Sequence, residues 1–386
     1  MIIPEGVLEK GAEHMRVLYF INGFDPGGAE HGLLTLVESG FFDGHELDIV
    51  GMCRGRGDLA EKLQRAVGEE RFHIADEREK LSPAGMLRGA FLLFRELRRF
   101  RPDIVVLSLK QANLVGRLVL RFFPAVHCVS FEHISRYRAR RAEWLYGALL
   151  RWTSGRVDEV WSDCRETLEE TRSYFVPRAR YENVVPLFCL DEDMPEKTSY
   201  ELGGTLKLAG AGRLVDRKNF DRLIEATRRL NDEGIATELT ILGDGPEYGV
   251  LQALRTKLGL QDKVSLPGYR AKWFREALKA DIFLNTSDTE GFCIVVAEAL
   301  AVGLPVIATD VGGIREYGHD GVNMLKLQGE SVGEVIAAIK RLRDDEGLRR
   351  DLGRRGRSDM QAEYALAMLR ERGKAVLSRK EAAGVF

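Results

Sequence analysis

The stretch EGFCIVVAE at residues 290–298 holds two carboxylates among uncharged, mostly small or apolar residues. Such surroundings exclude carboxylates unless something pairs with them. A helix from about Gly291 to Ala301 would put Glu290 at its mouth and Glu298 roughly 10 Å further along the axis, at about 1.5 Å per residue. The first N–H groups of that helix have no helical partner and suit phosphate oxygens. One carboxylate could then bind hydroxyls of a sugar and the other those of a ribose.

A second group of polar residues follows the strand-like run 206–212, in GRLVDRKNF. Arg213 comes directly after the run, and Lys218 leads into a helix. Two cations beside a helix N-terminus oppose its dipole, but they are well placed if a diphosphate lies between them and the helix. The alternatives are two solvated loop cations, a helix-capping acid at Glu290, and a Glu298 paired with an arginine. Taken alone, Glu290 and Glu298 are better explained by these structural roles. Together with Arg213 and Lys218, they are better explained by a bound sugar nucleotide.

The first half of the chain offers weaker candidates. In NGFDPGGAEHG, Gly27 and Gly28 follow a strand and open a helix, which favours a close-lying anion, although a plain turn explains them equally well. Neither a G-x-G-x-x-G nor a P-loop motif is present. His133 follows the strand-like run 126–131, and it fits a structural role as well as a catalytic one. The GDGP turn at 243–246 is expected to shape one wall of a binding site.

These residues all follow short apolar runs that resemble buried β-strands. Near-continuous apolar runs alternate with helical stretches and predict parallel strands covered on both faces. The runs fall into two series, at 16–22, 46–52, 103–108, 126–131 and 157–162, and then at 206–212, 237–245, 263–268, 281–287 and 304–310. The fold class is therefore α/β, with two Rossmann-like doubly wound domains whose facing strand ends should hold the ligand.

The composition narrows the functional classes. A net charge of −2 over 386 residues gives no overall case for nucleic acid binding. Five scattered cysteines without a C-x-x-C pair suggest a reducing cytoplasm, without a zinc site or a disulfide framework. No run reaches the ~18 apolar residues of a membrane span. The acidic triplet 191–193 lies away from any strand end, so we expect no metal and no cofactor.

One region departs from this balance. Residues 86–156 contain fourteen Arg or Lys against four acids, interleaved with aromatic residues and leucines. A basic, aromatic amphipathic face suits an anionic membrane surface. A solvated basic helix is the alternative. The first interpretation predicts a peripheral enzyme on the inner face of the cell membrane.

Together these motifs resemble the retaining glycosyltransferases of family 4, which have the two-domain GT-B fold. The resemblance is carried by PGGAE, the histidine after a mid-domain strand, G-R-L-x-x-x-K-N, GDGP, and EGFCIVVAE followed by ALAVGLPVIATDVGG. It is weakest over residues 31–125, where acceptors are usually recognised. Cys293 departs from the pattern, since Gly or Pro is frequent there, and this leaves the sugar preference open.

The resemblance implies roles for the candidate residues. Arg213 and Lys218 would neutralise the leaving diphosphate, Glu290 would hold the transferred sugar, Glu298 the ribose, and His133 would contact the sugar and the reaction centre. The donor site would be completed by Gly27, Gly28, Tyr269, Gly291, Phe292, Cys293 and Ile294. The expected domains are a flexible tail (1–14), an acceptor domain (15–190), a linker (191–204), a nucleotide-sugar domain (205–365) and a C-terminal helix (366–386) that packs back on the first domain.

The implied activity is transfer of a hexose-type sugar, with UDP favoured as carrier, to a lipid-linked or saccharide acceptor in assembly of bacterial surface polysaccharide or glycolipid. A nucleotide-sugar epimerase and an inactive nucleotide-sugar-binding subunit remain as alternatives. The sequence names neither the sugar, the acceptor nor the oligomeric state.

Overall fold

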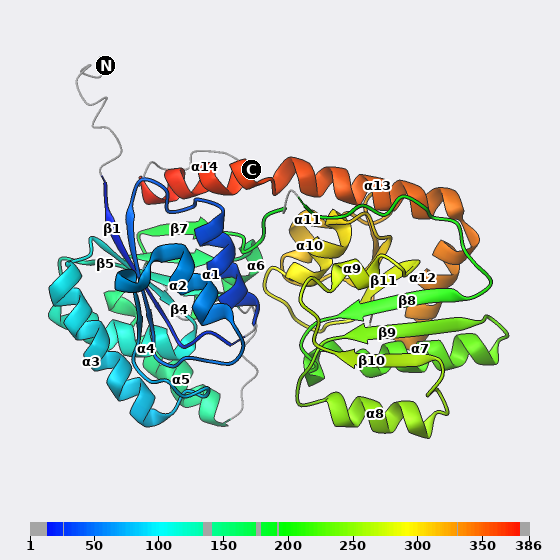
Figure 1. Ribbon diagram of the computed structural model, residues 1–386, viewed down its shortest axis with the longest axis horizontal. Coiled ribbons are helices and arrows are strands. Elements are labelled where there is room, and N and C mark those ends of the chain that lie inside the picture. Colours follow the sequence, from blue (N-terminus) through cyan, green and yellow to red (C-terminus); the bar gives the residue numbers. More distant parts are fainter. Residues whose placement is uncertain are drawn as a thin grey trace, which may run out of the picture.

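The structure is a computed structural model that describes residues 14–25, 27–133, 141–174, 179–190, 193–329 and 331–378. The predicted tail therefore lies outside the described residues, apart from residue 14. The described chain forms two sheets, each made of parallel strands and flanked by helices, and they lie side by side (Figure 1). This confirms the predicted α/β class with two Rossmann-like units.

The first sheet has the strand order β3-β2-β1-β4-β5-β6-β7. Its strands are β1 (Arg16–Ile21), β2 (Glu46–Gly51), β3 (Phe72–Ile74), β4 (Ile104–Ser108), β5 (His127–Glu132), β6 (Glu159–Ser162) and β7 (Tyr181–Val184). Almost every residue of β1, β4 and β6 is buried, because helices cover both faces. The helices are α1 (Gly28–Glu38), α2 (Leu59–Val67), α3 (Pro83–Phe100), α4 (Lys110–Val119), α5 (Arg141–Trp152) and α6 (Arg165–Tyr174).

The second sheet repeats the arrangement with the order β10-β9-β8-β11-β12-β13. Its strands are β8 (Leu206–Ala211), β9 (Thr237–Leu242), β10 (Val264–Gly268), β11 (Ile282–Asn285), β12 (Val306–Thr309) and β13 (Leu325–Leu327). The helices of this half are α7 (Phe220–Asp232), α8 (Tyr248–Lys257), α9 (Phe274–Ala277), α10 (Ile294–Ala301), α11 (Ile314–Tyr317), α12 (Val332–Asp344) and α13 (Glu346–Glu363).

Three strands were not predicted. They are β3, β7 and β13, all at or near sheet edges and only three or four residues long, too short for an apolar pattern to stand out. One helix was predicted too long, because α10 begins at Ile294 rather than near Gly291.

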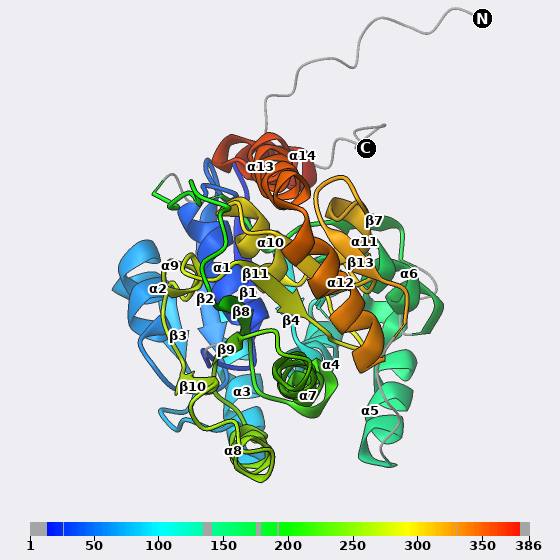
Figure 2. The same cartoon turned by 90° about the vertical axis from the view of Figure 1, so that its right-hand side faces the viewer.

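The last helix, α14 (Leu366–Leu377), follows α13 and lies along the first half (Figure 1). Figure 2 shows that α13 and α14 lie on the same side of the molecule. Its residues Leu369, Val376 and Leu377 are buried in the same hydrophobic cluster as Tyr19 and Leu33 of the first half. The described part of the segment between the sheets, 193–204, lies against the second half. There the Tyr200 hydroxyl donates to the Gly303 carbonyl (2.9 Å), and Arg349 donates to the Tyr200 carbonyl. In the described residues, no helix is long and apolar enough to cross a membrane.

Candidate active site

Lys218 and Glu290 form a buried ion pair, with 2.6 Å between Nζ and Oε1. They lie 72 residues apart but meet because β8 and β11 are neighbours in the second sheet, so that the loops after these strands are adjacent. Further bonds join the two loops. Asn219, in the left-handed conformation, donates to the Thr286 carbonyl, and the Thr286 hydroxyl donates to the Asn219 carbonyl.

Both members of this pair are charged. Burial opposes the charge on each residue, but their mutual attraction outweighs it, so the pKa of Lys218 is raised and that of Glu290 is lowered. Removing one partner of such a buried pair strongly destabilises the folded protein. Arg213, the other predicted cation, lies exposed directly beyond β8 and Gly212.

The loop that carries Glu290 ends in a conformation the sequence did not predict. Cys293 precedes α10 with φ +62°, a left-handed value that ends the irregular segment 290–293 and delays the helix to Ile294. Glu290 therefore does not lie on one helix with Glu298, and the rise of about 1.5 Å per residue does not give their separation. Gly312 (φ +56°) packs against the Gly291 carbonyl, and the Gly313 N–H donates to that carbonyl (2.7 Å).

Gly291 lies where the two halves meet. A methyl group on its Cα would overlap both the Asp163 carboxyl and the His133 carbonyl oxygen, which belong to the first half. The His133 ring is buried, its Nε2 is 2.8 Å from the Ser108 hydroxyl, and burial lowers its pKa to about 3. The predicted histidine and the predicted Glu290 loop are therefore neighbours, and the imidazole is neutral.

The start of α1 approaches the same junction from the first half. A Cβ on Gly28 would be 3.9 Å from the Ile294 side chain, and Ile294 packs against the main clusters of both halves. A side chain at Gly27 would overlap the Glu30 carboxyl. Glu30 was not among the predicted site residues, although it belongs to PGGAE. Burial raises its pKa to about 7, against the opposing field of Arg213 from the second half.

Glu298 faces an aromatic residue. The Trp273 indole N–H donates to its carboxyl (2.6 Å), and burial raises the pKa of Glu298 to about 7. The alternative role for Glu298, as the partner of an arginine, does not apply here, because a tryptophan from the segment before α9 fills that place. Tyr269 lies directly after β10 with an exposed side chain. The buried Phe292 ring packs against the rings of Tyr317 and Tyr364 in tilted and edge-on geometry. The Phe292 ring is therefore part of the second core.

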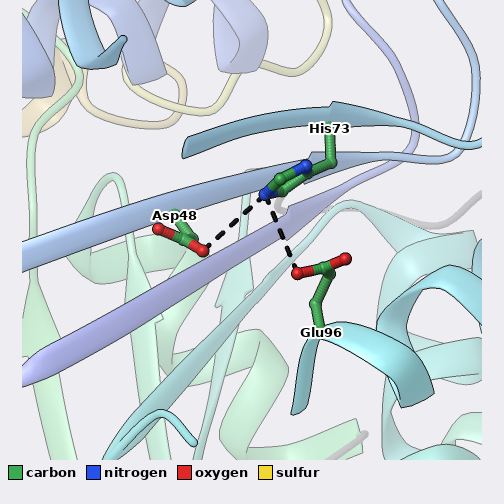
Figure 3. A group of neighbouring side chains, drawn as sticks. All are labelled: Asp48, His73 and Glu96. Carbon is green, nitrogen blue, oxygen red and sulfur yellow. Dashed lines mark ion pairs between the residues drawn. The ribbon is translucent and has the colours of Figure 1, made fainter. Parts of the chain in front are cut away.

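A group of possible metal ligands lies elsewhere. Asp48, His73 and Glu96 come from β2, β3 and α3, and their ligand atoms lie within 4.8 Å of one another (Figure 3). Arginines already occupy the carboxylates, since Arg71 and Arg99 pair with Asp48 and Arg99 also pairs with Glu96. These guanidinium groups satisfy the buried charge and repel a cation, so the group joins α3 to the edge of the first sheet.

Comparison with known proteins matches both halves of the chain. The family description "Glycosyl transferases group 1" fits residues 199–359, and "Glycosyl transferase 4-like domain" fits residues 27–186. The lipopolysaccharide core biosynthesis glycosyltransferase LpsD of Rhizobium meliloti is 33% identical over 159 residues, which are 41% of this chain and 45% of that protein. The putative colanic acid biosynthesis glycosyltransferase WcaL of Escherichia coli is 32% identical over 152 residues, 36% of this chain and 37% of that protein.

Solved structures match over nearly the whole chain. A crystal structure of Anabaena HepE in complex with UDP-glucose superposes with a TM-score of 0.79 over 95% of this chain and 100% of that one, at 18% identity. At this identity the likeness shows the fold, whereas the matches to the two curated relatives span less than half of their length. With both family descriptions fitting in order along the chain, the protein belongs to the group 1, family 4-like glycosyltransferases of the GT-B fold.

Proposed function

We propose that the protein is a retaining glycosyltransferase that transfers a hexose-type sugar from a nucleotide-sugar donor, with UDP as the favoured carrier. One observation carries the proposal: the charged Lys218–Glu290 pair is buried next to the junction where Gly291 meets His133 and Asp163. Anabaena HepE, with the same fold, has been crystallised with UDP-glucose, which supports the choice of UDP.

The charge of each side chain in the site suggests its role in the transfer. A leaving diphosphate gains negative charge in the transition state, and the Lys218 ammonium, with the Arg213 guanidinium, would stabilise it there. Glu290 is held ionised by Lys218, so it accepts hydrogen bonds from sugar hydroxyls but cannot act as a proton donor. His133 is neutral and contacts the reaction centre. Glu298 would hold the ribose hydroxyls.

Transfer breaks the bond between the anomeric carbon and the diphosphate oxygen. The acceptor hydroxyl forms the new bond on the same face, and its proton passes to the leaving diphosphate. The anomeric configuration is therefore kept, and no protein base is consumed.

A donor panel tests this function. The protein is incubated with UDP-, GDP- and ADP-sugars and release of the nucleoside diphosphate is followed, with NMR of the product anomer. We expect release with one donor, a retained anomer, unchanged rates in EDTA, and a large loss in Glu290→Gln. Release without an acceptor that yields an isomeric sugar would indicate an epimerase; tight binding without release would indicate an inactive subunit. Either result would overturn the proposal.

For the acceptor, we propose a lipid-linked or saccharide substrate and a peripheral position on the inner, cytoplasmic face of a membrane. The outward face of α3 supports the membrane contact. Leu87 and Phe91 are 75% and 72% exposed, and Arg95 and Arg98 lie on the same side of the helix at i, i+4 and i+7 from Phe91. Glu96, the acid of this helix, is buried instead. The exposed side of α3 is therefore apolar and cationic.

Neighbouring elements extend this face. The Arg98 guanidinium lies over the Phe94 ring, whose centroid is 5.2 Å from that of the Phe123 ring. The Arg121 guanidinium carbon lies 4.2 Å from the centroid of the Trp152 ring at the end of α5. Some of the fourteen cations counted in the sequence do not contribute. Arg117 is fully buried beside Glu132, Arg156 is bound to backbone carbonyls of the first half, and Arg99 pairs with Asp48 and Glu96. Arg136, Arg138 and Arg140 lie outside the described residues.

Liposome flotation tests the membrane contact. We expect binding to vesicles with anionic lipid at low salt, weakened by high salt and by the double change Leu87→Glu/Phe91→Glu. The matched control is Val250→Glu, because Val250 is a similarly exposed apolar residue (57%) on α8 of the other half. Equal binding by all three proteins, or no binding at low salt, would remove the membrane claim and leave a soluble saccharide acceptor.

A further inference from the structure

Asp163 is a buried carboxyl at the junction of the two halves, and the proposed transfer does not use it directly. It follows β6 and is 4% exposed. Its Oδ2 lies 4.0 Å from His133 Nδ1, and it touches the position a side chain on Gly291 would occupy. The backbone N–H of Phe292 also faces it. One side chain of the first half thus contacts both the reaction-centre histidine and the loop that carries Glu290.

Two buried polar atoms at this point have no hydrogen-bond partner among the described residues. They are Nδ1 of His133 and Oδ1 of Asp163. Buried polar atoms are rarely left so, and each costs about 1–3 kcal/mol. The 4.0 Å separation is about 1 Å longer than a hydrogen bond. A small approach of the two side chains would satisfy His133, whose other nitrogen already contacts Ser108.

Interdomain contacts hold Asp163 in place. On α6, the Glu166 carboxyl accepts from the Gly312 N–H and from Arg315, both at 2.9 Å, and the Arg165 N–H donates to Glu316. All three partners belong to the loop and helix after β12. The segment 163–166 is therefore fixed to the second half on one side and to His133 on the other.

The groups around Asp163 set its ionisation. Burial raises the pKa of its carboxyl to about 7, the N–H of Phe292 and the side chains of Thr167 and Cys164 oppose the rise, and Glu316 adds to it. The neighbouring His133 ring is neutral, because burial lowers its pKa to about 3, and the Cys164 thiol is neutral, because burial raises its pKa. Both forms of Asp163 are therefore populated near neutral pH.

We propose that Asp163 is a positioning residue: it orients the His133 ring and selects its tautomer, and it fixes the Gly291–Phe292 loop against the first half. An ionised Asp163 accepts a hydrogen bond from Nδ1–H, which leaves Nε2 as an acceptor. A protonated Asp163 donates to Nδ1 and forces the opposite tautomer. The inference rests on the proposed glycosyl transfer for its effect on rate, but the tautomer itself is independent of that function.

Asp163→Asn tests the proposal, because the amide keeps the shape and removes the ionisation. At saturating donor we expect kcat to fall at least about tenfold, while the affinity for UDP, measured by calorimetry, stays within about threefold. In the wild type kcat should rise with pH through about 7, because ionisation of Asp163 sets the productive tautomer, and Asp163→Asn should lose this rise. Wild-type kcat and pH profile in the variant would overturn the proposal.

Two control variants separate the role of Asp163 from a general effect of the interdomain contacts and from the titration of another carboxyl. Glu166→Gln weakens an interdomain contact on the same segment, and it should keep the pH rise of kcat. Glu30→Gln removes another carboxyl with a pKa near 7, and it should keep the rise too. Loss of the rise in either control would refute the assignment to Asp163.

NMR can test the tautomer of His133 even if the protein turns over none of the donors. In ¹⁵N-histidine NMR, with the His133 signals assigned from a His133→Asn sample, the tautomer should change with pH near 7 in the wild type and stay fixed in Asp163→Asn. If no donor is turned over, the proposed function fails, and the NMR result alone decides on Asp163. A His133 signal independent of pH in the wild type would then refute it.

Discussion

Three carboxyl groups, on Glu30, Asp163 and Glu298, share a pKa raised to about 7, in each case mainly by burial. Glu290 differs because Lys218 compensates its charge. The site therefore combines one carboxyl whose pKa is lowered by its ion pair with three whose pKa is raised to about 7. Each carboxyl contacts different groups, so its titration should affect a different property of the protein.

Glu298 should control donor affinity through its ionisation. Ribose hydroxyls donate hydrogen bonds, so the ionised form binds, and its fraction falls below pH 7 because burial raises the pKa. We expect the Kd for UDP to increase by up to about tenfold per pH unit below about 7. Calorimetry from about pH 8 to about pH 6 measures this. The raised pKa also affects the free energy of unfolding. The contribution of Glu298 is fully present below about pH 4.5, the ordinary pKa of a glutamate, and it is lost as the pH rises through about 7.

Two variants qualify this prediction. Glu298→Gln should bind UDP more weakly at about pH 8 and lose the pH dependence, whereas the exposed Glu238→Gln on β9 should behave as the wild type. A constant Kd over the same pH range in the wild type would contradict the role of Glu298. Substituting Glu290 should instead slow transfer, and identical effects of the two substitutions would contradict the division of roles.

The Lys218–Glu290 pair should show strong coupling in stability. Lys218→Met and Glu290→Gln each remove one charge of this buried pair, and each should lower the free energy of unfolding, by about 3–5 kcal/mol for the lysine change. The double variant should lose much less than the sum, since no lone charge remains. Urea unfolding of the four proteins measures the coupling. Additive losses would show that the two charges do not interact.

At the scale of elements, the loops after β8, β11 and β12 create the site by packing on each other and on the first half. The Glu290 loop depends on glycines, because His133 and Asp163 approach its backbone closely at Gly291. The late start of α10 follows from the left-handed Cys293. Loop packing, rather than the helix, therefore fixes the distance between Glu290 and Glu298.

Gly291→Ala tests the close approach. The new methyl group must displace the Asp163 carboxyl and the His133 carbonyl, so we expect a loss of about 1–3 kcal/mol in stability and a severe loss of transfer. Gly249→Ala is the matched control: it adds the same methyl group in α8 with nothing within 4 Å, and it should be neutral or stabilising. Thermal unfolding and donor turnover measure both. A Gly291→Ala protein with normal stability and activity would contradict the contact.

At the scale of the whole molecule, α14 ties the end of the chain to the first half. Leu369 lies in the first core, and Gly373 packs directly on the backbone of Phe41. Arg370 and Arg372 add contacts to Asp43 and to the Val184 carbonyl. Unfolding of the first half should therefore depend on a helix that follows the second half in sequence.

Leu369→Ala tests this dependence. Removing a buried leucine should cost about 2–5 kcal/mol, and hydrogen exchange should rise in β1 and β2 while β8 and β9 stay protected. Met368→Ala is the matched control, because the neighbouring Met368 is 47% exposed, and it should leave exchange unchanged. Faster exchange only in the second half would show that α14 does not support the first core.

The order of elements and the position of the site loops could be predicted from the sequence, because both are local. Apolar runs alternating with helices require parallel sheets covered on both faces, and in such sheets ligand loops follow the strands. Lys218, Glu290 and His133 were predicted as site residues in this way, and the structure brings their loops together. The short edge strands β3, β7 and β13 were not, because three or four residues carry too little pattern.

Only the tertiary structure decided which groups meet. Lys218 and Glu290 pair because β8 and β11 are neighbours, and Glu298 faces Trp273 instead of an arginine. Asp163 reaches the junction from the end of a strand that carries no motif for it. Burial and partners determine the charge of a side chain, and both depend on contacts between residues far apart in sequence. The sequence by itself therefore determined the fold class and the site loops, whereas tertiary packing decided the charge states and partners on which the chemistry depends.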